Sequence, residues 1–196
     1  MNTRFKSTSH RAFTLIEMLV VITIVGILAA LTGGAVTGVM KKAKKVKTQA
    51  ALKDIVLGIS NYRVEYNRFP LPQGQSSEDA IPLSAGSAIL KVLLGQNDGK
   101  MNPREIAYIE PPMAKNGAGG LSGSSGSYEF TDPWGTAYQV IMDANYDNKI
   151  TNPDTQNEDS TISAGAAREI VAGAVALSLG EDKKKNSKDD VVSWRP

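Results

Sequence analysis

The chain contains no cysteine and only one histidine, His10, among its 196 residues. The absence of cysteine excludes disulfide bonds, thiolate zinc sites and a cysteine nucleophile. A single histidine near the N-terminus also excludes a histidine-rich metal centre and a buried Ser-His-Asp triad. The sequence shows no phosphate-binding glycine loop and no nucleophile paired with a base. We therefore do not expect an enzyme.

The chain also has little net charge. Its 22 basic and 20 acidic residues leave a formal charge of +2, which is too small to indicate binding to nucleic acid. The basic residues are unevenly placed, because three of them lie in residues 1–12 and five more lie in residues 41–47. Their positions are therefore more informative than the total.

Between these two basic segments, the chain from Phe13 to Met40 carries a single charged residue, Glu17. About 20 apolar helical residues cross the hydrocarbon core of a bilayer, so this run predicts a transmembrane helix over 13–40. A chain of this size has too little mass to bury a helix that is apolar on all sides. A secretory signal peptide is the other alternative, but its apolar region has only about 7 to 15 residues.

Glu17 is unusual in such a run. A charged carboxylate inside an apolar membrane helix costs on the order of a few kcal/mol. Glu17 therefore either reaches the membrane interface, becomes protonated, or pairs with a positive group.

The run begins with Arg11-Ala12-Phe13-Thr14-Leu15-Ile16-Glu17 and continues with Met18-Leu19-Val20-Val21-Ile22. This segment closely resembles the cleavage and methylation motif of type IV pilin-like proteins. The resemblance implies a leader peptide over residues 1–12, cleavage by a prepilin peptidase between Ala12 and Phe13, and N-methylation of Phe13. It also implies that Glu17 acts in filament assembly. Ala12 departs from the glycine that more often precedes the cleavage site.

Cleavage would leave a cationic amine on Phe13, one helical turn or about 6 Å from Glu17. The two groups can neutralise each other within one chain, or Glu17 can pair with the amine of the next subunit. The resemblance implies the second arrangement. Loss of residues 1–12 removes three of the 22 basic residues and no acidic one, which leaves 19 against 20 and a net charge of −1.

A cluster of lysines follows the apolar run directly. Pilins are oriented with a cytoplasmic N-terminus. By the positive-inside rule, these lysines outweigh the three basic residues of the leader and favour the opposite orientation. We follow the motif on this point. Such a cluster is typical of a solvated neck at a membrane surface, and contact with anionic lipid or DNA is the alternative. Its members are Lys41, Lys42, Lys44, Lys45 and Lys47.

Apolar residues then recur at the three-and-four spacing of an amphipathic helix. We expect the transmembrane helix to continue over 41–70 and to end before Pro70, because the residue before a proline avoids helical geometry. The stretch 62–70 also resembles the end of the long N-terminal helix of pseudopilins. The residues with this spacing are Ala51, Leu52, Ile55, Val56, Ile59, Tyr62 and Tyr66.

Residues 71–196 are expected to form an exported globular domain. Residues 83–94 predict a short helix, 106–109 a short extended piece, and 138–142 and 170–179 two strands. A Gly/Ser-rich segment over 114–127 has no hydrophobic periodicity and predicts an exposed, mobile loop. The expected fold is α+β, with a long N-terminal helix packed on a small antiparallel sheet.

One acidic segment has the spacing of an EF-hand calcium loop, in which oxygen ligands alternate along the chain. Asn148 replaces the glycine of the sharp turn, and Asp154 replaces the bidentate glutamate. The alternative is a strand-connecting turn rich in Asn and Asp. This weaker candidate site comprises Asp143, Asn145, Asp147 and Asp154, together with Lys149, Ile150 and Thr151.

A second acidic segment runs from Gly180 to Trp194, and an Asp-Pro-Trp-Gly turn lies at 132–135. Together they resemble the C-terminal region of the major pseudopilin of type II secretion, whose loop binds one calcium ion. The resemblance assigns the ligands to Leu179, through its carbonyl, and to Asp182, Asp189 and Asp190. Three converging carboxylates would repel one another without a cation. A solvated loop is the alternative, since four lysines (Lys183, Lys184, Lys185 and Lys188) lie in the same segment.

The resemblance thus predicts a structural subunit that polymerises into a periplasmic pseudopilus and drives protein export. It implies a single-pass protein of the bacterial inner membrane before assembly, with prepilin peptidase, minor pseudopilins and an inner-membrane platform as partners and no nucleic acid. One alternative is a type IV pilin for adhesion, motility or DNA uptake, although major type IV pilins commonly carry a C-terminal cysteine pair. Another is a membrane-anchored calcium-binding module that does not assemble.

Overall fold

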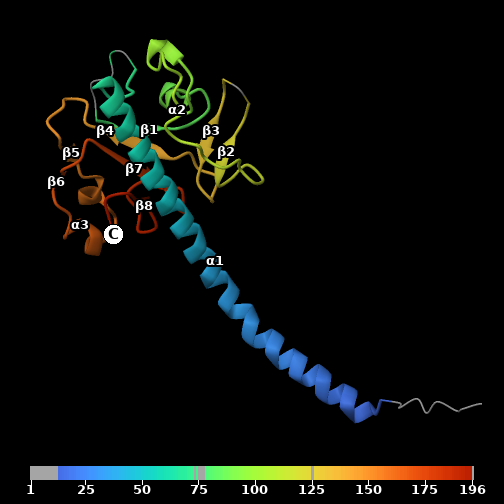
Figure 1. The fold of residues 1–196 in the computed structure, drawn as a ribbon. Helices are drawn as coiled ribbons and strands as arrows, with labels where there is room; N and C mark the ends of the chain where they lie inside the picture. Colours follow the sequence, from blue (N-terminus) through green and yellow to red (C-terminus); the bar gives the residue numbers. More distant parts are fainter. Residues whose placement is uncertain (1–12, 73, 75–77, 125, 196) are drawn as a thin grey trace, which may run out of the picture. The chain divides into compact units, whose positions relative to one another are not determined.

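The computed structural model describes residues 13–72, 74, 78–124 and 126–195, and for residues 31–36 it describes only the backbone. Contacts divide the chain into two units, Met1–Ala43 and Lys44–Pro196. Helix α1 (Leu15–Tyr66) contributes residues to both units. Figure 1 follows the elements along the chain.

Helix α1 begins directly after Thr14 and ends at Tyr66. Asn67 then adopts a left-handed backbone conformation with φ 51°, which ends the helix, and Pro70 follows three residues later. This confirms the expected long N-terminal helix. Its described side chains from Leu15 to Ala30 are all exposed.

No helix within the described residues combines the length and the apolar character that crossing a bilayer requires. The transmembrane helix expected over 13–40 therefore stays a prediction.

The main sheet lies in the second unit and has four antiparallel strands in the order β1-β4-β7-β8. In the register of its central pair, Val140 lies opposite Ala176. The long helix and the small antiparallel sheet confirm the predicted α+β fold. The four strands are β1 (Ile81–Pro82), β4 (Gln139–Met142), β7 (Ala174–Ser178) and β8 (Val191–Val192).

Two smaller antiparallel pairs and several short helices complete the second unit. Strand β2 (Gly120–Ser122) pairs with β3 (Glu129–Thr131), and β5 (Ile150–Thr151) pairs with β6 (Glu169–Ile170). The helices are α2 (Ala88–Leu93), α3 (Ser160–Ser163), and the 3₁₀ turns η1 (Asp98–Lys100) and η2 (Pro153–Gln156).

Three of these elements differ from the expectations. The helix expected over 83–94 starts only at Ala88, because the Ser87 hydroxyl caps it by accepting a hydrogen bond from the Leu90 N–H. The strand expected over 170–179 is divided into β6 and β7, which pair with different partners. The prediction that 114–127 is entirely an exposed loop is wrong, since it contains the paired strand β2, where Leu121 is buried.

The two faces of the main sheet bury different sets of side chains, because successive residues of a strand point to opposite sides. On one face, Val140 and Ala176 pack with Leu52, Ile55 and Ile59 of α1 in the largest core cluster. On the other face, Ile141, Val175 and Leu177 cluster with Ile150 of β5 and, at its margin, Ile170 of β6. The sheet is thus covered on both sides.

Candidate functional site

The first turn of α1 carries the residues that the motif resemblance selected. Ala12 lies outside the described residues, and Phe13 is 74% exposed. The Thr14 N–H and hydroxyl both donate to Glu17 Oε2, at 2.8 Å and 2.7 Å. In return, the Glu17 N–H donates to the Thr14 hydroxyl oxygen at 3.3 Å. The two residues therefore form a capping box.

This arrangement directs the Glu17 carboxylate toward the N-terminal end of the helix. An anion is stabilised there by the helix dipole and by N–H groups that have no partner within the helix. Phe13, the residue expected to carry a free amine after cleavage, immediately precedes Thr14. The sequence analysis did not select Thr14, although the Thr-x-x-Glu spacing at 14–17 is the signature of a capping box.

The C-terminal loop lies between β7 and β8, and Leu179 is its first residue after β7. Gly180 follows with φ 67°, and a side chain there would collide with the backbone carbonyl of Asp189. Asp189 Oδ2 accepts hydrogen bonds from the N–H groups of Glu181 and Asp182. Burial works against a low pKa of Asp189, but hydrogen bonds from Ser187 and from these backbone groups outweigh it and lower the pKa. Asp189 thus organises the loop as a carboxylate.

Ser187 lies between two of the predicted ligand residues. Its hydroxyl oxygen is 2.7 Å from Asp189 Oδ1 and 3.2 Å from Asp182 Oδ1. A hydroxyl has one proton to donate, so it can satisfy only one of these two carboxylate oxygens at a time. The loop therefore brings two acidic side chains to a single donor.

Asp190, the third predicted carboxylate ligand, is 5% exposed. Its Oδ2 accepts the Ser187 N–H at 3.1 Å, whereas its buried Oδ1 has no hydrogen-bond partner in the described part of the chain. Burial raises the pKa of Asp190 to about 6, although N–H groups of Ser187 and Asn186 oppose the shift. Asp190 therefore keeps a buried acceptor oxygen open.

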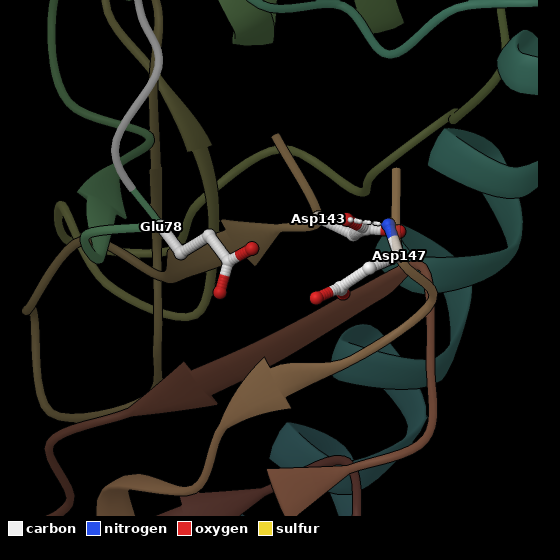
Figure 2. Close-up of side chains that lie close together, drawn as sticks. All are labelled: Glu78, Asp143 and Asp147. Atoms are coloured by element: carbon white, nitrogen blue, oxygen red, sulfur yellow. Dashed lines mark hydrogen bonds between the residues drawn. The ribbon is translucent and has the colours of Figure 1, made fainter. Parts of the chain in front are cut away.

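A different group of carboxylates comes closest together. Glu78, Asp143 and Asp147 each offer an oxygen within 4.8 Å of the others, and no other group of three or more acidic or histidine side chains in the described residues does so. Figure 2 shows Glu78 on a separate segment, facing Asp143 and Asp147. Asp143 is fully buried after β4 and accepts hydrogen bonds from the N–H groups of Asp147 and Asn148.

Glu78, the third member of this group, lies in an environment that disfavours its negative charge. Its Oε1 is buried and has no hydrogen-bond partner among the described residues. Burial raises the pKa of Glu78, and the nearby charges of Asp147 and Asp143 raise it further. The sequence analysis did not select Glu78, because no local pattern connects it with the loop after β4.

The EF-hand-like spacing is only partly reproduced. Asn145 exchanges two hydrogen bonds with Asp147, at 2.8 Å and 3.2 Å, so these residues lie together. Asp154 does not join them, since its two oxygens accept hydrogen bonds from Trp194 Nε1 at 2.8 Å and Arg195 Nη2 at 2.9 Å. The physical reason is the pairing of β5 with β6, which interrupts the loop and places Asp154 in η2.

Two comparisons with known proteins indicate what the chain is similar to. The family model described as the prokaryotic N-terminal methylation motif matches residues 7–33, the segment that contains Thr14 and Glu17. The chain is also 28% identical over 135 residues to the type II secretion system core protein G of Pectobacterium carotovorum subsp. carotovorum, and this match covers 67% of each chain. The chain is pseudopilin-like.

No solved structure matches this pseudopilin-like chain with comparable significance. The motif and the relative point to a structural, pilin-like subunit rather than to an enzyme.

Proposed function

We propose that this pseudopilin-like chain is the major structural subunit of a pseudopilus that drives protein export in a type II secretion system. The main support is that one chain has both the methylation motif over 7–33 and similarity over 67% of its length to a core protein of that system. The capping box of Thr14 and Glu17 supports it, because it holds a carboxylate beside the residue whose amine processing would free. The work of such a subunit is mechanical and needs no catalytic group.

The proposal includes a sequence of states. The precursor resides in the bacterial inner membrane as a single-pass protein with a cytoplasmic N-terminus, prepilin peptidase removes residues 1–12, and the mature chain joins a periplasmic filament. Its partners are other copies of itself, minor pseudopilins and an inner-membrane assembly platform. Glu17 pairs with the Phe13 amine of the neighbouring subunit, since an unpaired charge in an apolar environment favours the docked state.

The decisive experiment is the N-terminal mass spectrum of the protein purified from its native membrane. We expect the chain to start at Phe13 with one methyl group on its amine. A chain that starts at Met1 would overturn the proposal and would favour an anchored module that does not assemble. If the chain starts at Phe13, a deletion strain distinguishes the two kinds of filament. Loss of protein secretion without loss of surface pili would indicate a pseudopilus rather than a type IV pilus.

We also propose that the C-terminal loop binds one calcium ion through Asp182, Asp189, Asp190 and the Leu179 carbonyl. The donor set suits calcium, which takes hard oxygen ligands. Support comes from the open, buried Oδ1 of Asp190 and from the single Ser187 hydroxyl shared by Asp182 and Asp189. When bound, the ion would neutralise part of the negative charge of these acidic groups.

Thermal unfolding of the full chain in detergent tests the calcium site. At a calcium concentration of about 100 times Kd, the stabilisation is about 2.7 kcal/mol, or roughly 5 to 10 °C in Tm, relative to EDTA. The Asp190→Asn variant should lose this calcium-dependent shift. The Asp147→Asn variant is the matched control and should keep it, and loss in Asp147→Asn alone would move the ion to the group with Glu78 and Asp143.

A further inference from the structure

Five lysines of α1, Lys41, Lys42, Lys44, Lys45 and Lys47, follow directly after the apolar run that ends at Met40 and are called the lysine collar below. Successive residues of an α-helix are rotated by about 100°, so Lys41, Lys42 and Lys45 fall on one side of the helix and Lys44 and Lys47 fall on the other. Between Glu17 and Asp54 the chain contains no acidic residue. Lys42 and Lys45 therefore have no carboxylate within reach on their own stretch of helix.

Only part of the collar is used within the chain. Lys47 Nζ donates to the Gly119 carbonyl at 2.6 Å, and Lys44 Nζ lies 5.9 Å from the centroid of the Trp134 ring. Lys42 and Lys45 are exposed and make no ion pair with any residue that the structure describes. These two side chains are thus available to an external partner.

The arrangement restricts what that partner is. It has to accommodate apolar and basic side chains on adjoining turns of one helix, as the boundary between the hydrocarbon core and the headgroups of a bilayer does. The side chains just before the collar, Val39 and Met40, are apolar and exposed, so the change from apolar to basic is abrupt along the helix. Lysines next to an apolar helix end bind anionic headgroups by charge attraction, to which each lysine contributes separately.

We propose that Lys42 and Lys45, within the lysine collar, bind the phosphate groups of anionic phospholipids while the subunit is in the membrane, before assembly. The inference rests on the membrane-resident state of the proposed function. In the pilin orientation these lysines lie on the non-cytoplasmic side, where the positive-inside rule does not expect them. Binding of anionic lipid would explain their presence there. The lipid contact would fix the depth of the apolar segment and would have to be released when the subunit leaves the membrane.

The test uses the full chain in nanodiscs of equimolar phosphatidylglycerol and phosphatidylcholine, and native mass spectrometry counts the lipids that stay bound. We expect the wild-type chain to retain phosphatidylglycerol preferentially. The Lys42→Gln/Lys45→Gln variant should lose this preference, on the order of fivefold for each lysine removed. The matched control is Lys100→Gln/Lys115→Gln, which removes the same charge from two exposed positions elsewhere and should behave as wild type.

Salt provides a second readout. Raising the ionic strength from 0.1 M to 1 M shortens the screening length from about 10 Å to 3 Å and should abolish the preference. Equal retention of the two lipids by the wild-type chain, or an unchanged preference in the collar variant, would overturn the proposal. So would a collar variant that keeps its lipid preference but loses binding to a double-stranded oligonucleotide.

The Glu17→Val variant separates this inference from the proposed function. It retains the whole collar and should show the wild-type lipid preference while failing to form filaments. A wild-type chain that prefers phosphatidylglycerol but never assembles would refute the filament and leave the lipid contact standing. A chain that assembles without any lipid preference would do the reverse.

Discussion

The Thr14 hydroxyl donates to Glu17 Oε2 at 2.7 Å and accepts the Glu17 N–H in return, so the two residues cap the start of α1 for each other. A capping interaction contributes about 1 kcal/mol to the start of a helix. Capping alone does not explain a carboxylate here, because glutamine also caps at this position. The charge of Glu17 is therefore the feature to test.

We predict that Glu17→Gln and Glu17→Val both leave cleavage after Ala12 intact and both stop filament assembly. Glutamine keeps an oxygen that accepts the Thr14 hydrogen bonds but has no charge to pair with the Phe13 amine of a neighbour. Electron microscopy of filaments sheared from cells, together with the N-terminal mass, measures both effects. Thr14→Ala is the companion variant and should reduce assembly without abolishing it. Normal filaments from Glu17→Gln would show that Glu17 acts only as a cap.

Two nearby residues of α1, Ile59 and Leu57, lie on its buried face and on its exposed face. Ile59 is fully buried against the sheet, whereas Leu57 is 59% exposed. Ile59→Ala should lower the free energy of unfolding by about 2 to 5 kcal/mol, because it leaves a cavity in the core. Leu57→Ala should change it by less than about 0.5 kcal/mol. Thermal unfolding of the detergent-solubilised chain measures both, and equal losses would contradict the described packing.

Asp154 attaches the C-terminal residues to the segment between β5 and β6. It is 6% exposed and accepts hydrogen bonds from Trp194 and Arg195, whose side chain is also mostly buried. Asp154→Ala leaves both donors without an acceptor, at a cost of about 1 to 3 kcal/mol for each unsatisfied group. We expect a fall in Tm of several degrees.

The control for this variant is Asp79→Asn, which changes an exposed acidic residue. Its Tm should match that of the wild type. If Asp154→Ala unfolds at the wild-type temperature, the C-terminal residues are not held by this contact. A fall in Tm that also appears in Asp79→Asn would indicate a general effect of charge rather than the loss of a specific bond.

Buried tyrosines predict how stability depends on alkaline pH. Burial raises the pKa of Tyr138 above its ordinary value of 10, although a hydrogen bond with Thr48 opposes the shift, and burial also raises the pKa of Tyr108 to about 12. Because the folded-state pKa is above the unfolded one, the contribution of each neutral tyrosine is complete below pH 10 and is lost as the pH rises above it.

The chain should therefore lose stability between about pH 10 and 12, and Tyr138→Phe should lose less, since phenylalanine has no proton to release. Urea unfolding at several pH values measures the slope. A slope that Tyr138→Phe does not reduce would place the alkaline transition elsewhere.

Sequence patterns were sufficient for features that depend on near neighbours in the chain. Helix hydrogen bonds join residues four apart, so the apolar periodicity and Pro70 determined the long helix and its end at Tyr66. The methylation motif and the Thr-x-x-Glu spacing at 14–17 are local in the same sense.

Tertiary structure decided which distant segments meet. The same apolar stretch supplied β6 to one partner and β7 to another, and β2 formed in a glycine-rich loop because β3 lies beside it. Folding also placed the Glu78 carboxylate near Asp143 and paired Asp154 with Arg195. No sequence pattern connects the segments that carry these residues. Strand pairing and side-chain clusters bring together residues that are far apart in the chain, and closing these long loops costs conformational entropy. Only the contacts of the assembled core offset this cost, so the pairing depends on the whole fold.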